Sequence, residues 1–282
     1  MWDTPVDDQT AAALEVLGRH VRGARRQAAL SQRQVEAMTG IDQTTLVRIE
    51  HGRATGLPLR RFAVLLVALD ARVPPWDRRI DLVVLTHPHE DHVGGLPLVL
   101  QRYRVGQVVE PGMPGRSPGY EALETILAAR GGASGRLVAG DHFSLDGIAF
   151  DVLWPDAGRV PREASDDGGE VNDASIVLLG SFEGRRFLLT GDAEADVEGE
   201  LAARGLPTVD LLKTGHHGSR TSTTYALIEA TRPVVAAVSV GARNDYGHPS
   251  REVLARLERA GATVLRTDQV GTIDAALGRG PG

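Results

Sequence analysis

Residues 82–96 read LVVLTHPHEDHVGGL, an apolar run that ends abruptly in imidazoles and carboxylates. The apolar part is typical of a buried β-strand that ends near Thr86. Gly94 and Gly95 then allow a tight bend into a helix. In α/β proteins the loops at the carboxyl ends of strands are the usual place for a site. The motif H-x-H-x-D-H therefore supplies four candidate metal ligands: His87, His89, Asp91 and His92.

Three later motifs repeat this arrangement of an apolar run followed by potential ligands. FLLTGDAE supplies Asp192, LLKTGHHGSRTS supplies His216 and His217, and DYGHPS supplies His248. Together, HPHEDH, GHHGS and YGHP hold six of the nine histidines, which chance placement does not explain. If the strand ends meet, the ligands form a dinuclear centre that can activate water and stabilise charge on a phosphoryl or acyl oxygen. Because the chain has no cysteine, nitrogen and oxygen ligands are expected, which suit zinc, manganese or iron.

The composition is that of a globular protein. The chain has 282 residues, of which 42% are hydrophobic and 24% charged, and its formal net charge is −6. No apolar run reaches the roughly 20 residues that span a bilayer, and the acidic start MWDTPVDDQT is no secretory signal. We therefore expect a cytoplasmic protein with no membrane segment in this chain.

A break at residues 70–79, DARVPPWDRR, separates two kinds of pattern. Before it, apolar residues recur at helical spacing. After it, short runs rich in valine, isoleucine and leucine alternate with amphipathic stretches such as YEALETILAARG and SREVLARLERAG. The pattern predicts a multidomain protein, with an all-α bundle over residues 1–72 and a layered α/β domain over residues 73–282.

Residues 31–53, SQRQVEAMTGIDQTTLVRIEHGR, are typical of a helix-turn-helix. Ser31 is a natural N-cap, Gly40 can end the first helix, and residues 43–50 form a second one with Leu46 and Ile49 inward. The segment from Arg19 to Arg61 holds nine arginines against three acidic residues, which suggests a local nucleic-acid contact. A structural or protein-docking bundle is the alternative. The outward side chains of the second helix can reach bases and phosphates in a major groove: Gln43, Thr44, Thr45 and Arg48.

Taken together, residues 12–71 resemble the Cro/repressor-like (XRE-type) DNA-binding domain. The resemblance implies that Gln32 touches phosphate and that the outward side chains of the second helix face the groove. It also implies DNA as a partner and a possible homodimer, because such domains usually bind two half-sites.

HxHxDH, TGD, GHHGS and a late GHP resemble the metallo-β-lactamase superfamily, and DLVVLTHPHEDHVGGLPLVL with LLKTGHHGSRTS looks like the hydrolase domain of ComEC-type DNA-uptake (competence) proteins. The resemblance covers residues 76–274. It implies an αββα fold, two divalent metal ions (zinc or manganese) and a nuclease acting on DNA. By position the metal ligands would be His87, His89, Asp91, His92, Asp192 and His248. One of His216 and His217 would complete the set and the other would face the substrate; His216 is favoured as the ligand. His217 would then face the scissile phosphate and share catalysis with Asp91, and Ser219 and Thr221 would bind substrate.

Two departures from this pattern leave other functions open. Asn172 stands where the superfamily's third-motif histidine is usual, and the strands that normally precede HxHxDH are not evident, so we expect an N-terminally truncated domain. The alternative to a nuclease is a transcriptional regulator whose truncated domain is an inactive sensor or dimerisation module. Hydrolysis of a small ester, lactone or thioester, and a fusion without a joint function, are further possibilities.

Overall fold

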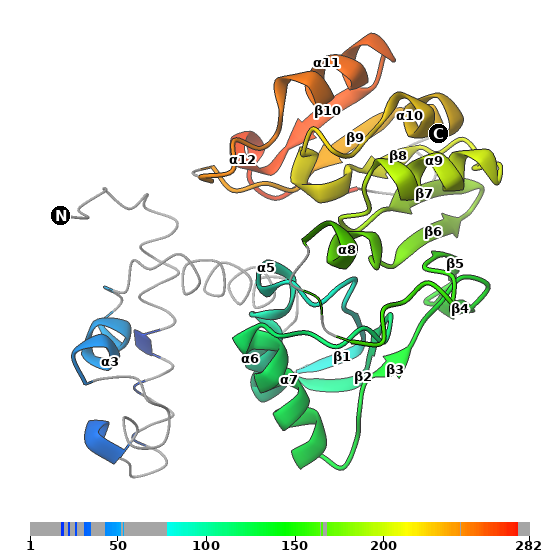
Figure 1. The fold of residues 1–282 in the computed structure, drawn as a ribbon. Helices are drawn as coiled ribbons and strands as arrows, with labels where there is room; N and C mark the ends of the chain where they lie inside the picture. The colour runs from blue at the N-terminus through cyan, green and yellow to red at the C-terminus, as the bar shows by residue number, and fades with distance from the viewer. Residues whose placement is uncertain are drawn as a thin grey trace. The chain divides into compact units, whose positions relative to one another are not determined.

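The structure is a computed structural model (Figure 1). It describes residues 78–275 except 164, 166, 167 and 243, together with these N-terminal stretches: residues 18–19, 22, 26, 31–34, 43–51 and 53. The chain divides into two compact units, residues 1–81 with 93–106 and residues 82–92 with 107–282. The expected boundary between residues 72 and 73 lies outside the described residues. In the part of the chain described, no helix is long and apolar enough to cross a membrane.

The helices and strands follow the periodicities of the sequence. The helices are α3 (Gln43–Glu50), α5 (Glu90–Val93), α6 (Leu96–Arg102), α7 (Pro118–Ala129), α8 (Gly168–Asp173), α9 (Ala195–Ala203), α10 (Tyr225–Thr231), α11 (Arg251–Arg259) and α12 (Thr267–Val270), with a 3₁₀ turn at Gly215–Gly218. The strands are β1 (Arg79–Val84), β2 (Arg104–Glu110), β3 (Gly135–Arg136), β4 (His142–Leu145), β5 (Ile148–Trp154), β6 (Val177–Phe182), β7 (Arg185–Leu189), β8 (Leu211–Lys213), β9 (Val235–Val238) and β10 (Thr263–Arg266).

These strands form two sheets. The smaller has the order β1-β2-β3, and the larger has the order β10-β9-β8-β7-β6-β5-β4. Strands β4 to β7 are antiparallel neighbours, whereas β7, β8, β9 and β10 run parallel. Because β7, β8 and β9 run parallel, the loops that follow them leave from the same edge of the sheet. These loops carry Asp192, the two adjacent histidines and His248, so the topology brings the later motifs to one edge.

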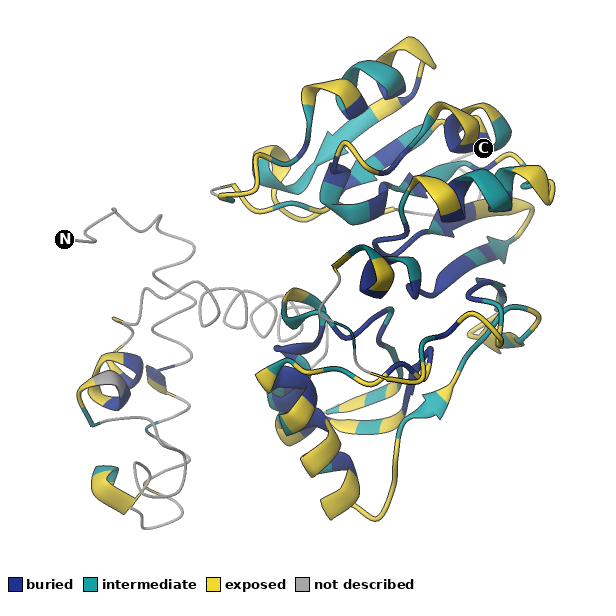
Figure 2. Ribbon diagram, in the orientation of Figure 1, coloured by how far each residue is buried: buried dark blue, intermediate teal, exposed yellow. Residues whose placement is uncertain are grey.

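Apolar side chains fill the space on both faces of the larger sheet. On one face Val152, Ile176 and Leu178 pack with Val84 of β1 and with Leu137, which places the smaller sheet against the larger. On the other face a second cluster joins the sheet to α9 and α10, and a third joins β9 and β10 to α11. Tyr120 of α7 in turn donates a hydrogen bond to Glu110 at the end of β2. The layers are thus helix, sheet, sheet and helix, as the sequence predicts, with their buried residues between the layers (Figure 2).

The helix-turn-helix segment is described only in part. Ser31 caps its helix as predicted, because its Oγ accepts the backbone N–H of Gln34 at 3.2 Å. Leu46 and Ile49 of α3 are buried, again as predicted. Residues 35–42, with the expected turn at Gly40, lie outside the described residues.

Candidate metal centre

The loop that follows β1 brings three imidazoles together. His87 is fully buried, and its Nε2 lies 3.1 Å from Nδ1 of His89. The ring centroid of His92, on the short helix α5, lies 4.1 Å from that of His87. The hydroxyls of Thr86 and Ser175 lie 3.0 and 3.1 Å from Nδ1 of His87. His87 is therefore held through Nδ1, and its Nε2 faces the other histidines.

Asp192 and His217 meet this loop from the ends of β7 and β8. Nε2 of His92 lies 3.2 Å from Oδ2 of Asp192 and 3.2 Å from Nε2 of His217. Nε2 of His217 also lies 3.3 Å from Asp192 and 3.4 Å from Oδ2 of Asp91. Nδ1 of His217 lies 2.8 Å from the carbonyl oxygen of Ser239, so it donates there and leaves Nε2 directed at the carboxylates. Two overlapping groups of possible ligands result: His87, His92 and Asp192, and Asp91, His92 and His217.

The protonation of this cluster follows from burial and close charges. Burial would raise the pKa of Asp192, but hydrogen bonds from His217 and His92 hold it well below its usual range. Burial lowers the pKa of His217, but its bonds to Asp192 and Asp91 outweigh that and raise it to about 9. Burial lowers the pKa of His87 and, less strongly, of His89. Burial would raise the pKa of Asp91, but its hydrogen bond with His217 and the charge of His92 hold it below its usual range. The cluster therefore holds two ionised carboxylates, with neutral imidazoles on its buried side.

His216 and His217 point to different partners because the backbone between Thr214 and Ser219 is unusual. Both histidines adopt left-handed conformations, with φ of 45° and 54°. Nδ1 of His216 lies 3.0 Å from Oε1 of Glu194, which also accepts a hydrogen bond from Asn172. The sequence favours His216 as the metal ligand, but the structure places His217 in the ligand cluster and His216 beside Glu194.

The other expected site residues lie next to His216. Thr221 Oγ1 lies 3.4 Å from its Nδ1 and 3.0 Å from Oγ of Ser219. The ring centroid of His248 lies 5.6 Å from that of His216. His248 thus lies near the centre but in neither group of possible ligands. His142 is exposed on β4, away from the two ligand groups, and pairs with Asp151.

Four supporting residues have no place in the sequence-based ligand set. Ser175 Oγ accepts the N–H of Asp192 at 3.0 Å while its oxygen also contacts His87, so one hydroxyl holds two expected ligands. Lys213 Nζ donates to the carbonyl oxygen of Gly191 and lies 3.5 Å from Oδ1 of Asp192. Glu194 and Asn172 hold His216. The sequence signal for Asn172 and Ser175 is the polar cluster VNDAS directly before an apolar strand.

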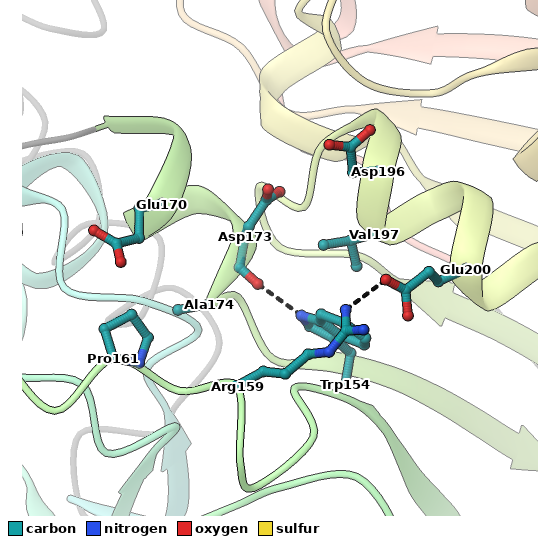
Figure 3. Close-up of a pocket in the computed structure, with 9 residues that line it drawn as sticks. All are labelled: Trp154, Arg159, Pro161, Glu170, Asp173, Ala174, Asp196, Val197 and Glu200. Atoms are coloured by element: carbon teal, nitrogen blue, oxygen red, sulfur yellow. Dashed lines mark hydrogen bonds and ion pairs between the residues drawn. The ribbon is translucent and has the colours of Figure 1, made fainter.

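A pocket of about 320 Å³ is lined by Glu170 and Asp173 of α8 together with Trp154, Arg159 and Glu200 (Figure 3). Trp154 Nε1 donates to the carbonyl oxygen of Asp173 at 2.6 Å, and the guanidinium of Arg159 stacks over the Trp154 ring. Oδ1 of Asp173 accepts the N–H of Glu194 at 3.1 Å. Trp154 therefore fixes the end of α8, and with it the contacts of Asn172 and Glu194.

The expected DNA-binding side chains of α3 lie partly as the sequence suggests. Thr44 and Arg48 are exposed and Gln43 is half-buried, while the side chain of Thr45 lies outside what the structure describes. Gln32 donates through Nε2 to Oε2 of the buried Glu50 at 3.1 Å. The side-chain amide of Gln32, which the resemblance places at a DNA phosphate, is thus hydrogen-bonded to Glu50 in the N-terminal domain.

Comparison with known proteins agrees with this fold and these motifs. The model of the metallo-β-lactamase superfamily matches residues 73–242, more than half of the chain. The chain belongs to the metallo-β-lactamase superfamily. A helix-turn-helix domain model matches residues 16–76, so this member carries such a domain before its metallo-β-lactamase domain.

Among curated proteins, this metallo-β-lactamase domain is similar to parts of competence proteins. The chain is 35% identical over 198 residues to ComE operon protein 3 of Bacillus subtilis, covering 70% of this chain and 24% of that protein. It is 32% identical over 206 residues to competence protein ComA of Neisseria gonorrhoeae, covering 72% of this chain and 26% of that protein. The chain thus spans about a quarter of the length of these relatives.

A solved structure with a similar arrangement is CmlA, a diiron β-hydroxylase from Streptomyces venezuelae. It is 19% identical, with a TM-score of 0.45, over 70% of this chain and 45% of that one.

The donor set fits the metal ions that the superfamily implies. Imidazole and carboxylate donors suit zinc and manganese. The closest donor pairs of the cluster lie 3.1 to 3.4 Å apart. Donors about 2.1 Å from one ion lie about 3 Å apart at octahedral and somewhat farther apart at tetrahedral angles. Among the described residues, buried Oδ1 of Asp192 has no hydrogen bond within normal geometry and only the ammonium of Lys213 at 3.5 Å, so this oxygen can still accept a further bond.

Proposed function

We propose that this chain is a metal-dependent phosphodiesterase that cleaves DNA, with an N-terminal helix-turn-helix that binds DNA. The observation that carries the proposal is the meeting of Asp91, His92, Asp192 and His217 at one point. Nε2 of His217 lies 3.2 to 3.4 Å from the ligand atoms of the other three, and Nε2 of His92 lies 3.2 Å from Asp192 and 3.9 Å from Asp91. Side chains from residues 91 to 217 meet there beside the buried His87 and the half-buried His89. A structural role alone would not require so many ionisable groups.

In this proposal the two divalent ions are held by six residues: His87, His89, Asp91, His92, Asp192 and His217. When bound, such ions lower the pKa of water and stabilise negative charge on a phosphoryl oxygen. Asp91 is only partly buried and lies at the open side of the cluster, where it can orient the attacking water. Ser175 and Lys213 hold Asp192, which keeps the carboxylate in place between the two ligand groups.

The phosphate group would contact the rim of the centre. His216 is oriented by Glu194, and the hydroxyls of Ser219 and Thr221 lie beside it. Imidazole and hydroxyl groups can donate hydrogen bonds to phosphate oxygens. His248 lies against His216 and completes this rim.

DNA is the proposed substrate for two reasons. One relative is named a competence protein, and another, from Haemophilus influenzae, is named "Recombination protein 2" (31% identical over 194 residues). Competence and recombination are processes whose material is DNA. A helix-turn-helix domain precedes the hydrolase domain, and exposed Thr44 and Arg48 on α3 are suited to a major groove. We further propose a domain boundary near residue 72 and a homodimer formed through the N-terminal domain, because single helix-turn-helix modules usually bind paired half-sites.

The test is elemental analysis of the purified chain, followed by DNA cleavage assays with manganese and with zinc. We expect two ions per chain and cleavage that is lost on His89→Ala. His142→Ala is the matched control, because His142 is an exposed histidine far from the motifs in sequence and its imidazole pairs with surface Asp151. Tight binding to duplex DNA by a chain that takes up no metal would instead support a transcriptional regulator with an inactive hydrolase domain.

A further inference from the structure

Tyr246 is the most exposed large apolar side chain of the described residues, at 69% of its full accessible area. It lies in the loop between β9 and α11, which also carries His248. Because the ring of Tyr246 is exposed, it contributes little buried apolar area to the stability of the fold. An exposed aromatic ring beside a polar cluster is therefore a candidate contact for a ligand that binds the ring face.

The loop that presents Tyr246 is internally fixed. The side chain of Asn244 donates to the carbonyl oxygens of Gly241 at 3.0 Å and His248 at 2.7 Å, and its Oδ1 accepts the N–H of His248 at 2.9 Å. One amide thus closes the loop on both sides of Tyr246. These hydrogen bonds fix the loop in the conformation that exposes the Tyr246 ring.

One face of Tyr246 stacks on the ring of His248, with centroids 6.0 Å apart and planes 15° apart. His248 in turn lies 5.6 Å from His216, in an edge-on arrangement. The N–H of Ser250 donates to the carbonyl oxygen of Gly218 at 2.9 Å, which joins the Tyr246 loop to the turn that carries His216 and His217. Tyr246 and His248 therefore form an aromatic ledge that leads to the rim of the centre.

We propose that this ledge binds a nucleobase of a single-stranded nucleic acid and so makes single strands the preferred substrate. The proposal rests on the proposed phosphodiesterase function and names its substrate class. Every base has a π-face that stacks on an aromatic ring, and in a duplex these faces are already covered by neighbouring base pairs. Tyr246 supplies one such ring, held flat by His248 and separate from the groups that would contact phosphate.

The experiment compares two single-stranded hexamers with the full chain. One is hexathymidylate, and the other is a backbone of the same length and charge that lacks all bases. We expect Tyr246→Ala to lower kcat/KM for hexathymidylate about tenfold, since stacking contributes about 1–3 kcal/mol per base, and to leave cleavage of the abasic hexamer unchanged. Tyr246→Phe keeps the ring and should behave like the unmodified chain. Tyr246→Leu keeps an apolar cover for His248 without a π-face and should behave like Tyr246→Ala.

Two results would overturn the ledge. In one, Tyr246→Ala slows cleavage of both hexamers equally, or Tyr246→Leu cleaves hexathymidylate as fast as the unmodified chain. Either outcome would mean that the Tyr246 ring only packs against His248. In the other, no Tyr246 variant changes either hexamer. Binding of fluorescein-labelled hexamers, measured by anisotropy, separates this question from catalysis, and the helix-turn-helix is the same in every variant. If the chain cleaves no DNA, the phosphodiesterase proposal fails. If Tyr246→Ala binds labelled hexathymidylate as tightly as the unmodified chain, the ledge itself is refuted.

Discussion

Nε2 of His217 lies 3.3 Å from Oδ2 of Asp192, while the adjacent imidazole of His216 lies against Glu194. We therefore expect His217→Ala to lose about one bound ion per chain, because the carboxylates lose their shared imidazole. His216→Ala should keep its metal and lose activity through poorer contact with phosphate. Metal content by mass spectrometry, read beside the cleavage rate, checks both. Equal metal loss in the two variants would contradict this division of roles.

Ser175 contacts His87 and Asp192 through one oxygen, so its removal disturbs two expected ligands at once. Ser175→Ala should weaken metal binding by about 10- to 100-fold, the usual cost of losing a group that orients a ligand. Titration with zinc in a competing chelator measures this. Ser144→Ala, on the exposed face of β4, is the control and should leave the affinity unchanged.

Glu198 of α9 supports the turn that carries both histidines. Its carboxylate is fully buried and accepts the backbone N–H groups of Thr223 and Thr224 at 2.6 and 2.7 Å. Glu198→Ala leaves these donors unsatisfied and should lower the free energy of unfolding by about 2–4 kcal/mol, measured by urea denaturation. Glu200→Ala, on the same helix, removes only surface ion pairs and should cost less than about 1 kcal/mol. Similar losses in both would show that Glu198 is not a special support.

Glu110 should make stability depend on pH. Burial raises the pKa of its carboxyl, an effect that hydrogen bonds from Ser134 and Tyr120 only partly oppose. The folded chain therefore holds this proton at pH values where the unfolded chain has released it, and stability falls as pH rises from about 4.5 through the raised pKa. Urea denaturation at a series of pH values should show this fall, and Glu110→Gln should remove it. Glu121→Gln, on the exposed side of α7, should keep the fall unchanged.

Much of the fold can be predicted because its strands are apolar runs with clear ends. The apolar runs after residue 79, among them DLVVLT and TVLRTD, are strands in the structure, and the amphipathic stretch SREVLARLERAG forms α11. Strands β3 and β4 escape prediction: β3 has two residues, and β4, with the sequence HFSL, has little apolar periodicity. Short strands are held by their neighbours in the sheet, and this is not visible in a local pattern.

The candidate site is predicted to the level of motifs but not of individual atoms. Spacing within HPHEDH and GHHGS identifies the histidines, whereas the choice between His216 and His217 depends on two successive left-handed residues. That conformation is fixed by contacts from distant helices, among them the bond between Glu198 and Thr223. Glu194 likewise becomes a partner of His216 only once β7 and β8 lie side by side.

The dispersal of the donors along the chain has a consequence for biogenesis. HPHEDH is synthesised about a hundred residues before Asp192 and still longer before His217. A nascent chain that has emerged only as far as β2 presents four of the six proposed ligands, three imidazoles and the carboxylate of Asp91, and is a weak chelator. Full affinity arises when β7 and β8 have docked, so we expect ion capture to be one of the last events of maturation and to lock the assembled sheets against reopening.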